Sequence, residues 1–167
     1  MGNVCKMRQT LISYLLEEGM NAKVEDGQII FEYNESLFVV DFEMNEHYSE
    51  CIINFKCEDD EYESLTTNDK TYIADKVNTD KENHATVYTF NDSFNVSTSF
   101  YFCNKQMMLD LFRIHFRDMT ESVDMTIDIV TDKIEEKKHR TRKIGFYTHE
   151  VYDNNSESCA SKIVASL

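Results

Sequence analysis

The sequence predicts an α+β fold: an antiparallel sheet built in the order helix, four strands, helix, two strands, helix, with the long C-terminal helix packed on the sheet. Three observations support this prediction. Apolar residues alternate with a period of two over consecutive segments, which indicates strands with one buried face. Apolar residues recur at helical spacing at both ends of this region. Asp-Gly and Asn-containing pairs separate several of the strands. With 167 residues, 41% of them hydrophobic, the chain can bury one substantial core.

The first helix is expected over residues 4–18, with Asn3 as its N-cap. Its apolar stripe comprises Val4, Met7, Leu11 and Leu15. Gly19 follows, at the position where helices commonly end in the left-handed conformation. A helix with one apolar stripe is expected to pack on a sheet.

Six strands are expected, at residues 22–25, 28–33, 36–44, 50–57, 86–90 and 93–103. The expected turns are Asp26-Gly27, Asn34-Glu35 and Asn91-Asp92. In the third strand Phe38 and Val40 alternate with Leu37 and Val39, so the two pairs lie on opposite faces. One face of the sheet is therefore expected to be buried, with the other directed outward.

Two further helices are expected. The middle helix begins near Thr66, because Thr66 and Asp69 resemble a capping box. The last helix follows Asn104 as its cap, and its apolar stripe spans about seven turns. That stripe comprises Met108, Phe112, Phe116, Met119, Val123, Ile127, Val130 and Ile134. A break at 120–122 is an alternative, because Thr and Ser form helices weakly.

Charge is distributed unevenly along the chain. Residues 1–132 hold 26 acidic and 10 basic side chains, whereas 133–143 hold six basic and two acidic ones. We expect one domain at 1–136, followed by a basic run and C-terminal tail at 137–167. Basic side chains suit the negative end of a helix dipole, and contact with an anionic partner is the alternative. The tail is expected to add an edge strand or to serve as a docking arm.

The sequence contains no recognisable catalytic or metal-binding motif. No histidine forms an HxxxH pair or lies at zinc spacing from a cysteine, and GxSxG, Walker and GxGxxG motifs are missing. His115 lies beside the apolar stripe, where a hydrogen-bonded packing role is favoured. The acidic run 58–61 is interpreted as a solvated loop. We therefore expect no catalytic residue, no metal and no cofactor.

Compartment and partner class follow from composition. No segment approaches the roughly 20 apolar residues that cross a bilayer, and the N-terminus resembles a signal peptide poorly. We therefore expect a cytoplasmic protein, without membrane association. Its acidity opposes nucleic-acid binding. Five cysteines without a CxxC pair are expected to be buried, reduced thiols.

Three stretches resemble the YbjN-type bacterial sensory transduction regulators, which share the fold of class I type III secretion chaperones. The first resembles the family's opening helix and hairpin, the second its middle helix and next strand, and the third its last strand and final helix. They read LISYLLEEGMNAKVEDGQIIFEYNESLFVVDF (11–42), YIADKVNTDKENHATVYTFND (72–92) and FNVSTSFYFCNKQMMLDLFRIHF (94–116). The resemblance covers residues 4–132. The absence of proline and the tail from about residue 137 depart from the family.

The resemblance implies a non-enzymatic module, chaperone-like or regulatory, that binds a segment of a partner protein. A homodimer is left open. The expected contact residues are Leu37, Val39, Ile52 and Tyr101 on the outward sheet face, and Phe146, Tyr147 and Tyr152 in the tail. One alternative is a ligand-binding or enzymatic domain with a pocket between the long helix and the sheet. Another is an acidic, immunity-like protein that neutralises a basic partner.

Overall fold

The computed structural model describes residues 2–44, 48–80, 84–90 and 92–153. The chain divides into two units, residues 1–129 and 130–167, and each is considered by itself. The first unit holds the sheet, three helices and the beginning of the fourth helix. Helix α4 (Lys105–Asp153) continues into the second unit.

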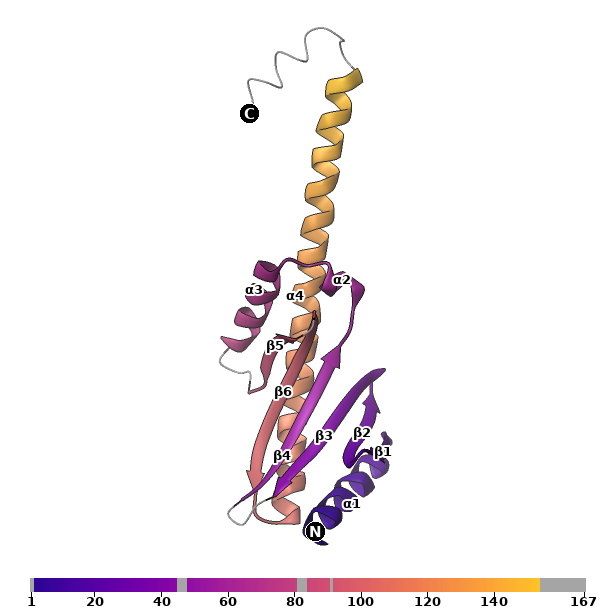
Figure 1. Cartoon of the computed structure of the whole chain (residues 1–167), viewed down its shortest axis with the longest axis vertical. Helices are drawn as coiled ribbons and strands as arrows, with labels where there is room; N and C mark the ends of the chain where they lie inside the picture. Colours follow the sequence, from indigo (N-terminus) through magenta and orange to yellow (C-terminus); the bar gives the residue numbers. More distant parts are fainter. Residues whose placement is uncertain (1, 45–47, 81–83, 91, 154–167) are drawn as a thin grey trace. The chain divides into compact units, whose positions relative to one another are not determined.

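The sheet has six strands in the order β1-β2-β3-β4-β6-β5, and all neighbours are antiparallel. The strands are β1 (Asn21–Glu25), β2 (Gln28–Tyr33), β3 (Ser36–Met44), β4 (Ser49–Cys57), β5 (Thr86–Phe90) and β6 (Ser93–Phe102). Figure 1 shows β3, β4 and β6 side by side in the middle of the sheet. The predicted α+β fold is therefore confirmed, and each strand lies within one residue of its expected bounds.

Residues with positive φ form the turns of the first two hairpins. Asp26 and Gly27 have φ of 50° and 82°, and Asn34 and Glu35 have φ of 49° and 63°. Two consecutive left-handed residues form the primed turn whose twist matches that of paired strands. Both hairpins therefore follow from the turn residues that the sequence places there.

Helix α1 (Gly2–Glu17) ends as predicted, with Gly19 in the left-handed region at φ 82°. The Met20 N–H donates to the Leu15 carbonyl at 2.9 Å, and the Gly19 N–H donates to the Leu16 carbonyl at 3.1 Å. These two bonds satisfy carbonyls that the helix end would otherwise leave unpaired. The expected N-cap was wrong, because Asn3 already lies inside the helix.

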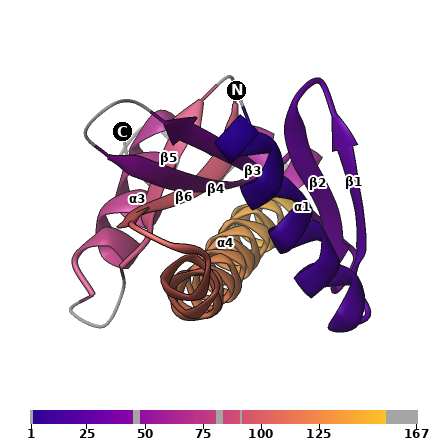
Figure 2. The ribbon, with the colours of Figure 1, turned by 90° about the horizontal axis from the view of Figure 1, so that it is seen from below.

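Aromatic rings from the sheet and from α1 and α4 form the core. The ring of Phe31 lies 5.4 Å from that of Phe38 and 5.3 Å from that of Phe116, and Tyr14 of α1 meets Phe112 of α4 edge-on at 6.2 Å. In Figure 2 the first part of α4 runs along one side of β3, β4 and β6. We call this side of the sheet the inner face. Its fully buried members include Ile29, Phe31, Phe38, Val40, Cys51, Ile53, Phe94 and Val96.

Helix α3 (Thr67–Asn78) closes one edge of the sheet. Its predicted capping box is present, with the Asp69 N–H donating to the Thr66 hydroxyl. At its other end, the Asn78 side chain donates to the Val87 carbonyl and accepts from the Val87 N–H, both at 2.8 Å. One amide side chain thus satisfies both backbone groups of an edge residue, which blocks strand pairing at Val87.

The structure corrects the apolar stripe and the end of the last helix, and it excludes the alternative break at 120–122. Ile127 is 42% exposed, while Thr126 and Ile129 are buried. The helix does not break at 120–122, because the Ser122 and Thr126 hydroxyls donate to carbonyls one turn earlier and are satisfied within it. It also continues through the basic run to Asp153, so those residues do not end it and residues 144–153 add no edge strand.

Two smaller predictions also need correction. The acidic run contains a one-turn helix, α2 (Asp60–Glu63), because Asp59 caps it by accepting from the Tyr62 N–H at 2.8 Å. Among the cysteines in the described residues, Cys51 is buried but Cys5 and Cys103 are exposed. All of these described thiols are free, and Cys159 lies outside the described residues.

Candidate protein-binding surface

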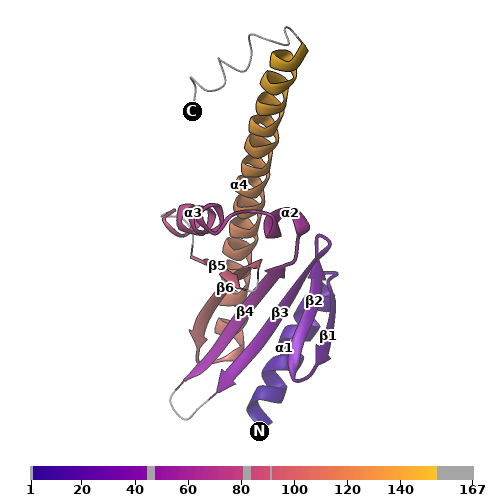
Figure 3. The same cartoon turned by 45° about the horizontal axis from the view of Figure 1, so that its top comes forward.

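Four contact residues expected from the sequence all lie on the outer face, the side of the sheet opposite the core. Leu37 and Tyr101 are 56% and 58% exposed, and Val39 and Ile52 are half-buried. Figure 3 shows β3 and β4 facing the viewer with α4 behind them. The outer face is therefore accessible at these positions in the described part of the chain.

Strand register gathers the apolar residues of this face around Val39. Ile30 is its direct partner on β2, Leu37 is its neighbour along β3, and Ile52 lies diagonally across on β4. Such cross-strand and diagonal neighbours are close enough for their side chains to touch. We call Ile30, Leu37, Val39 and Ile52 the apolar patch. Sequence reasoning missed Ile30, although its alternation with the buried Ile29 and Phe31 could have revealed it.

Acidic and aromatic residues lie where β4 begins. Glu50 is the direct partner of Glu43 on β3 and of Tyr101 on β6. The Tyr48 ring meets the Tyr101 ring edge-on at 5.2 Å. We call Glu43, Tyr48, Glu50 and Tyr101 the acidic corner. Like charges directly opposite each other on neighbouring strands are unfavourable, so a cation near the two glutamates would be stabilising.

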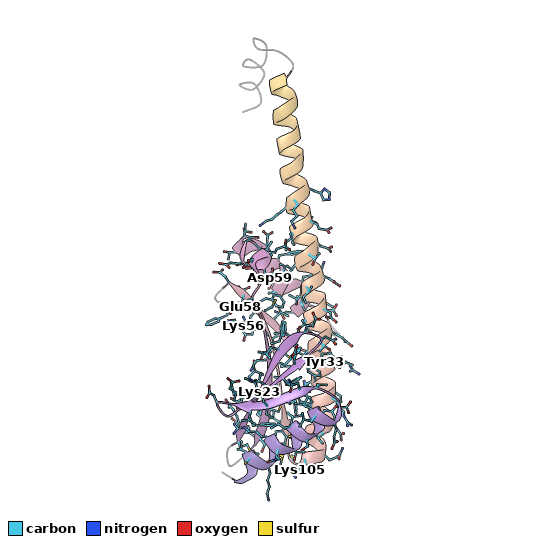
Figure 4. The ribbon with its side chains drawn as sticks, turned by 90° about the vertical axis from the view of Figure 1, so that its right-hand side faces the viewer. Lys23, Tyr33, Lys56, Glu58, Asp59 and Lys105 are labelled. Carbon is cyan, nitrogen blue, oxygen red and sulfur yellow. The ribbon has the colours of Figure 1, made fainter. Side chains whose placement is uncertain are left out.

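Lysines elsewhere on the outer face already have anionic partners. Lys23 lies 2.8 Å from Glu25, and Lys56 pairs with Glu58. Figure 4 labels Lys23, Lys56 and Glu58. The hydrogen bond from each lysine lowers the pKa of its glutamate partner. Among the described residues, Glu43 and Glu50 have no such ion-pair partner. The acidic corner thus carries negative charge that no lysine or arginine in the described part of the chain compensates.

A polar depression of about 500 Å³ lies over β4, β6 and β5, next to the acidic corner. Its lining residues are Glu50, Ile52, His84, Thr86, Tyr88, Ser97, Thr98 and Ser99. The Ser97 hydroxyl donates to the Asn54 side-chain oxygen at 2.8 Å, which holds that amide beside the depression. Hydroxyl groups of this kind can donate to or accept from a bound chain.

His115 has the packing role expected from the sequence. Its Nδ1 lies 3.0 Å from the Thr98 hydroxyl, and its ring stacks on Phe100 with centroids 4.9 Å apart. Burial lowers the pKa of His115 below its usual value, against the opposing effect of Asp118. This histidine belongs to the inner face and contributes nothing to the outer surface.

The other three expected contact residues cannot be placed on a surface. Phe146, Tyr147 and Tyr152 have backbones within α4, and their side chains lie outside the described residues. Sequence reasoning also missed Tyr48 and Glu50. Tyr48 precedes its strand, and a pairing between Glu43 and Glu50 becomes evident only once the register of β3 and β4 is known.

The described residues offer no metal site and no membrane-spanning helix. No group of three or more histidine, cysteine, aspartate or glutamate side chains there could hold a metal ion. No helix there combines the length and the apolar character needed to cross a membrane.

No protein-family model matches the chain, and no curated protein matches it. Its structure is similar to the crystal structure of an uncharacterized protein from Methanothermobacter thermautotrophicus, with a TM-score of 0.49 and 12% identity over 73% of this chain and 97% of that one. It is also similar to the crystal structure of YbjN from E. coli, with a TM-score of 0.38 and 12% identity over 79% of this chain and 92% of that one. Neither likeness says what this chain binds.

Proposed function

We propose that this chain is a non-enzymatic, cytoplasmic protein-interaction module, chaperone-like or regulatory, that holds an extended segment of a partner protein on the outer face. The observation that carries the proposal is the apolar patch. Four aliphatic side chains adjoin one another there, and they remain exposed or half-buried in the described part of the chain. Contiguous apolar surface of this kind commonly marks an interaction site.

An extended segment suits the geometry of this surface. Its side chains alternate with a period of two, so every second one would meet the sheet while the others remain in solvent. Because Val39 lies between Ile30 and Ile52, one apolar side chain of the partner could contact all three. A partner residue of this kind would act as an anchor.

The charge of the chain restricts the class of partner. Residues 1–132 carry 26 acidic and 10 basic side chains, a balance that repels nucleic acid and anionic lipid. A second copy would carry the same excess of negative charge. A partner segment that is neutral or basic therefore fits better than a homodimer through this face.

Selection of peptides from a displayed library tests the proposal. Random twelve-residue peptides are selected on the intact protein, and binding of the enriched peptides is measured by fluorescence anisotropy. We expect micromolar affinity for the intact protein and at least about a tenfold loss with Leu37→Glu, since the substitution puts a charge into the apolar contact. Leu16→Glu is the matched control, because Leu16 is 53% exposed on α1 and lies outside the apolar patch, and its affinity is expected to be unchanged.

Two outcomes would refute this function. In one, no peptide is enriched above an empty support. In the other, the enriched peptides bind Leu37→Glu and the intact protein equally well. If the chain instead forms a dimer that grows with concentration and is lost with Leu37→Glu, the outer face binds a second copy and not a partner segment.

A further inference from the structure

Strand β6 extends beyond its outer neighbour β5. The last pair between them joins Thr86 to Ser97, and β6 then continues to Phe102. Figure 1 shows the free lower part of β6 beyond the end of β5. On its other side, β6 remains paired with β4 through to Phe102. The last five residues of β6 thus have a strand neighbour on one side only among the described residues.

The backbone groups that point to this open side can be identified from α3. Because the Val87 N–H and carbonyl bind the Asn78 side chain, they point away from β6. In an antiparallel pair such residues alternate with residues that exchange hydrogen bonds, so Ser97 directs its own groups toward β5. The same alternation directs the N–H and carbonyl of Ser99 and Tyr101 toward the open side.

These four backbone groups form a short edge. In the described part of the chain, neither Ser99 nor Tyr101 makes a backbone hydrogen bond on that side. The polar depression reaches this edge through Ser97 and Ser99. Sheet edges with free donors and acceptors are templates for an added strand. Asn78 occupies the edge of β5 at Val87, whereas the outward groups of Ser99 and Tyr101 have no such partner among the described residues.

The acidic corner lies directly beside this edge. Tyr101 belongs to both, and its direct partner on β4 is Glu50, which in turn faces Glu43. A strand added next to β6 would place one side chain beside the exposed Tyr101 ring. An arginine or lysine at that position could cover the ring and extend toward Glu50, because strands lie about 4.8 Å apart.

We propose that the β6 edge at Ser99 and Tyr101 is a strand-addition site for a partner segment that presents a basic side chain to the acidic corner. The inference rests on the proposed function and deepens it, since it adds a pairing site beside the outer face and specifies the charge that the partner carries there. Backbone bonds to Ser99 and Tyr101 supply affinity, and the basic side chain supplies selectivity. A second copy of the chain is a poor occupant, because its own excess of acidic residues would approach Glu43 and Glu50.

The probe is a synthetic, acetylated eight-residue peptide of alternating threonine and valine with one central arginine. Two companion peptides carry citrulline in place of arginine, or N-methyl groups on alternate backbone nitrogens. Binding to the full chain is followed by amide chemical shifts and by hydrogen exchange. We expect the peptide to shift and protect the Ser99 and Tyr101 amides. Citrulline and N-methylation should each weaken binding about fivefold or more.

Variants of the protein distinguish the contribution of charge to peptide binding from that of backbone pairing. With Glu50→Gln, the preference for arginine over citrulline should fall severalfold, whereas Glu32→Gln should retain it. Ser99→Pro removes one outward N–H that has no partner in the described structure, so it should weaken binding with little effect on the other strands. Circular dichroism and the free energy of unfolding report whether each variant is folded. If the Ser99→Pro variant is not folded, the Glu50→Gln variant and the N-methylated peptide still test the proposed site.

The site is refuted if the arginine and citrulline peptides bind equally, or if the N-methylated peptide binds as well as its parent. It is also refuted if the shifts occur at β1 and leave Ser99 and Tyr101 unchanged. Those results would leave the proposed function intact as long as selected peptides still depend on Leu37. Loss of the Leu37 dependence, with the β6 edge still occupied, would refute the apolar patch instead.

Discussion

Phe38 and Leu37 are neighbours in β3, yet one is 1% exposed and the other 56%. The alternation that buries Phe38 among rings on the inner face directs Leu37 outward to the apolar patch. The inner face is aromatic and covered by helices, whereas the outer face mixes aliphatic, hydroxyl and acidic side chains. The difference suggests that one face of the sheet determines stability and the other is available for binding.

The largest expected effect is the difference in stability loss between substitutions on the two faces of a single strand, β3. Phe38→Ala should lower the free energy of unfolding by about 3–5 kcal/mol, because it removes a buried ring and leaves a cavity. Leu37→Ala should change it by less than about 0.5 kcal/mol, because the side chain is exposed. Urea denaturation of both variants measures this. Similar losses from the two substitutions would contradict the assignment of the faces.

Thiol reactivity provides a second test of the same comparison. Cys51 lies on the inner face, and burial strongly raises the pKa of its thiol, so little reactive thiolate forms. Cys5 and Cys103 are exposed. Alkylation by iodoacetamide, followed by peptide mass spectrometry, should modify these two at least about 100-fold faster than Cys51, which must await opening of the structure. Equal rates would show that β4 does not bury Cys51.

The closed edge at β5 gives a smaller effect. Asn78→Ala removes both bonds to Val87 and should lower the free energy of unfolding by about 1–3 kcal/mol. Because the β5 edge would then be free, the variant should also associate at high concentration. Asn68→Ala, an exposed site in the same helix, is the matched control. An Asn78→Ala variant as stable and monomeric as Asn68→Ala would show that Asn78 does not protect the edge.

The smallest expected effect concerns pH. Burial lowers the pKa of His115, so the folded chain binds this proton less readily than the unfolded chain does. The stability contribution of neutral His115 is therefore full above its unfolded pKa of about 6.5 and is lost as the pH falls toward the lowered value. The charge of Asp118 opposes this lowering of the pKa, and the charge of His84 reinforces it. His115→Gln should make stability less dependent on pH below about 6.5, as measured by urea denaturation, whereas an unchanged dependence would exclude His115 as its source.

Much of the fold could be predicted because its signals are local. Alternation located the strands, and Asp26-Gly27 and Gly19 marked a hairpin and a helix end. For the last helix, the sequence prediction extended one regular apolar stripe too far. Thr126 occupies a buried position that the apolar stripe assigned to Ile127, because its hydroxyl bonds to the Ser122 carbonyl and needs no water.

The surface was less predictable because it depends on register. Leu37, Val39, Ile52 and Tyr101 could be assigned to the outer face by alternation alone. The meeting of Glu43 with Glu50, and the free end of β6, require knowledge of which strands pair and where each pairing ends. Neither feature has a local signal in the sequence. The one-turn helix α2 was missed for a similar reason, since four residues are too few to show a period.

The central claim is that the outer face holds an extended partner segment. The most direct measurement is the map of backbone amide shifts on the full chain when it binds a peptide selected from the displayed library. The account predicts shifts along β2, β3, β4 and β6, centred on Leu37, Val39 and Ile52, with α1 unaffected. Shifts centred on α1 or α3, with the apolar patch unchanged, would contradict it.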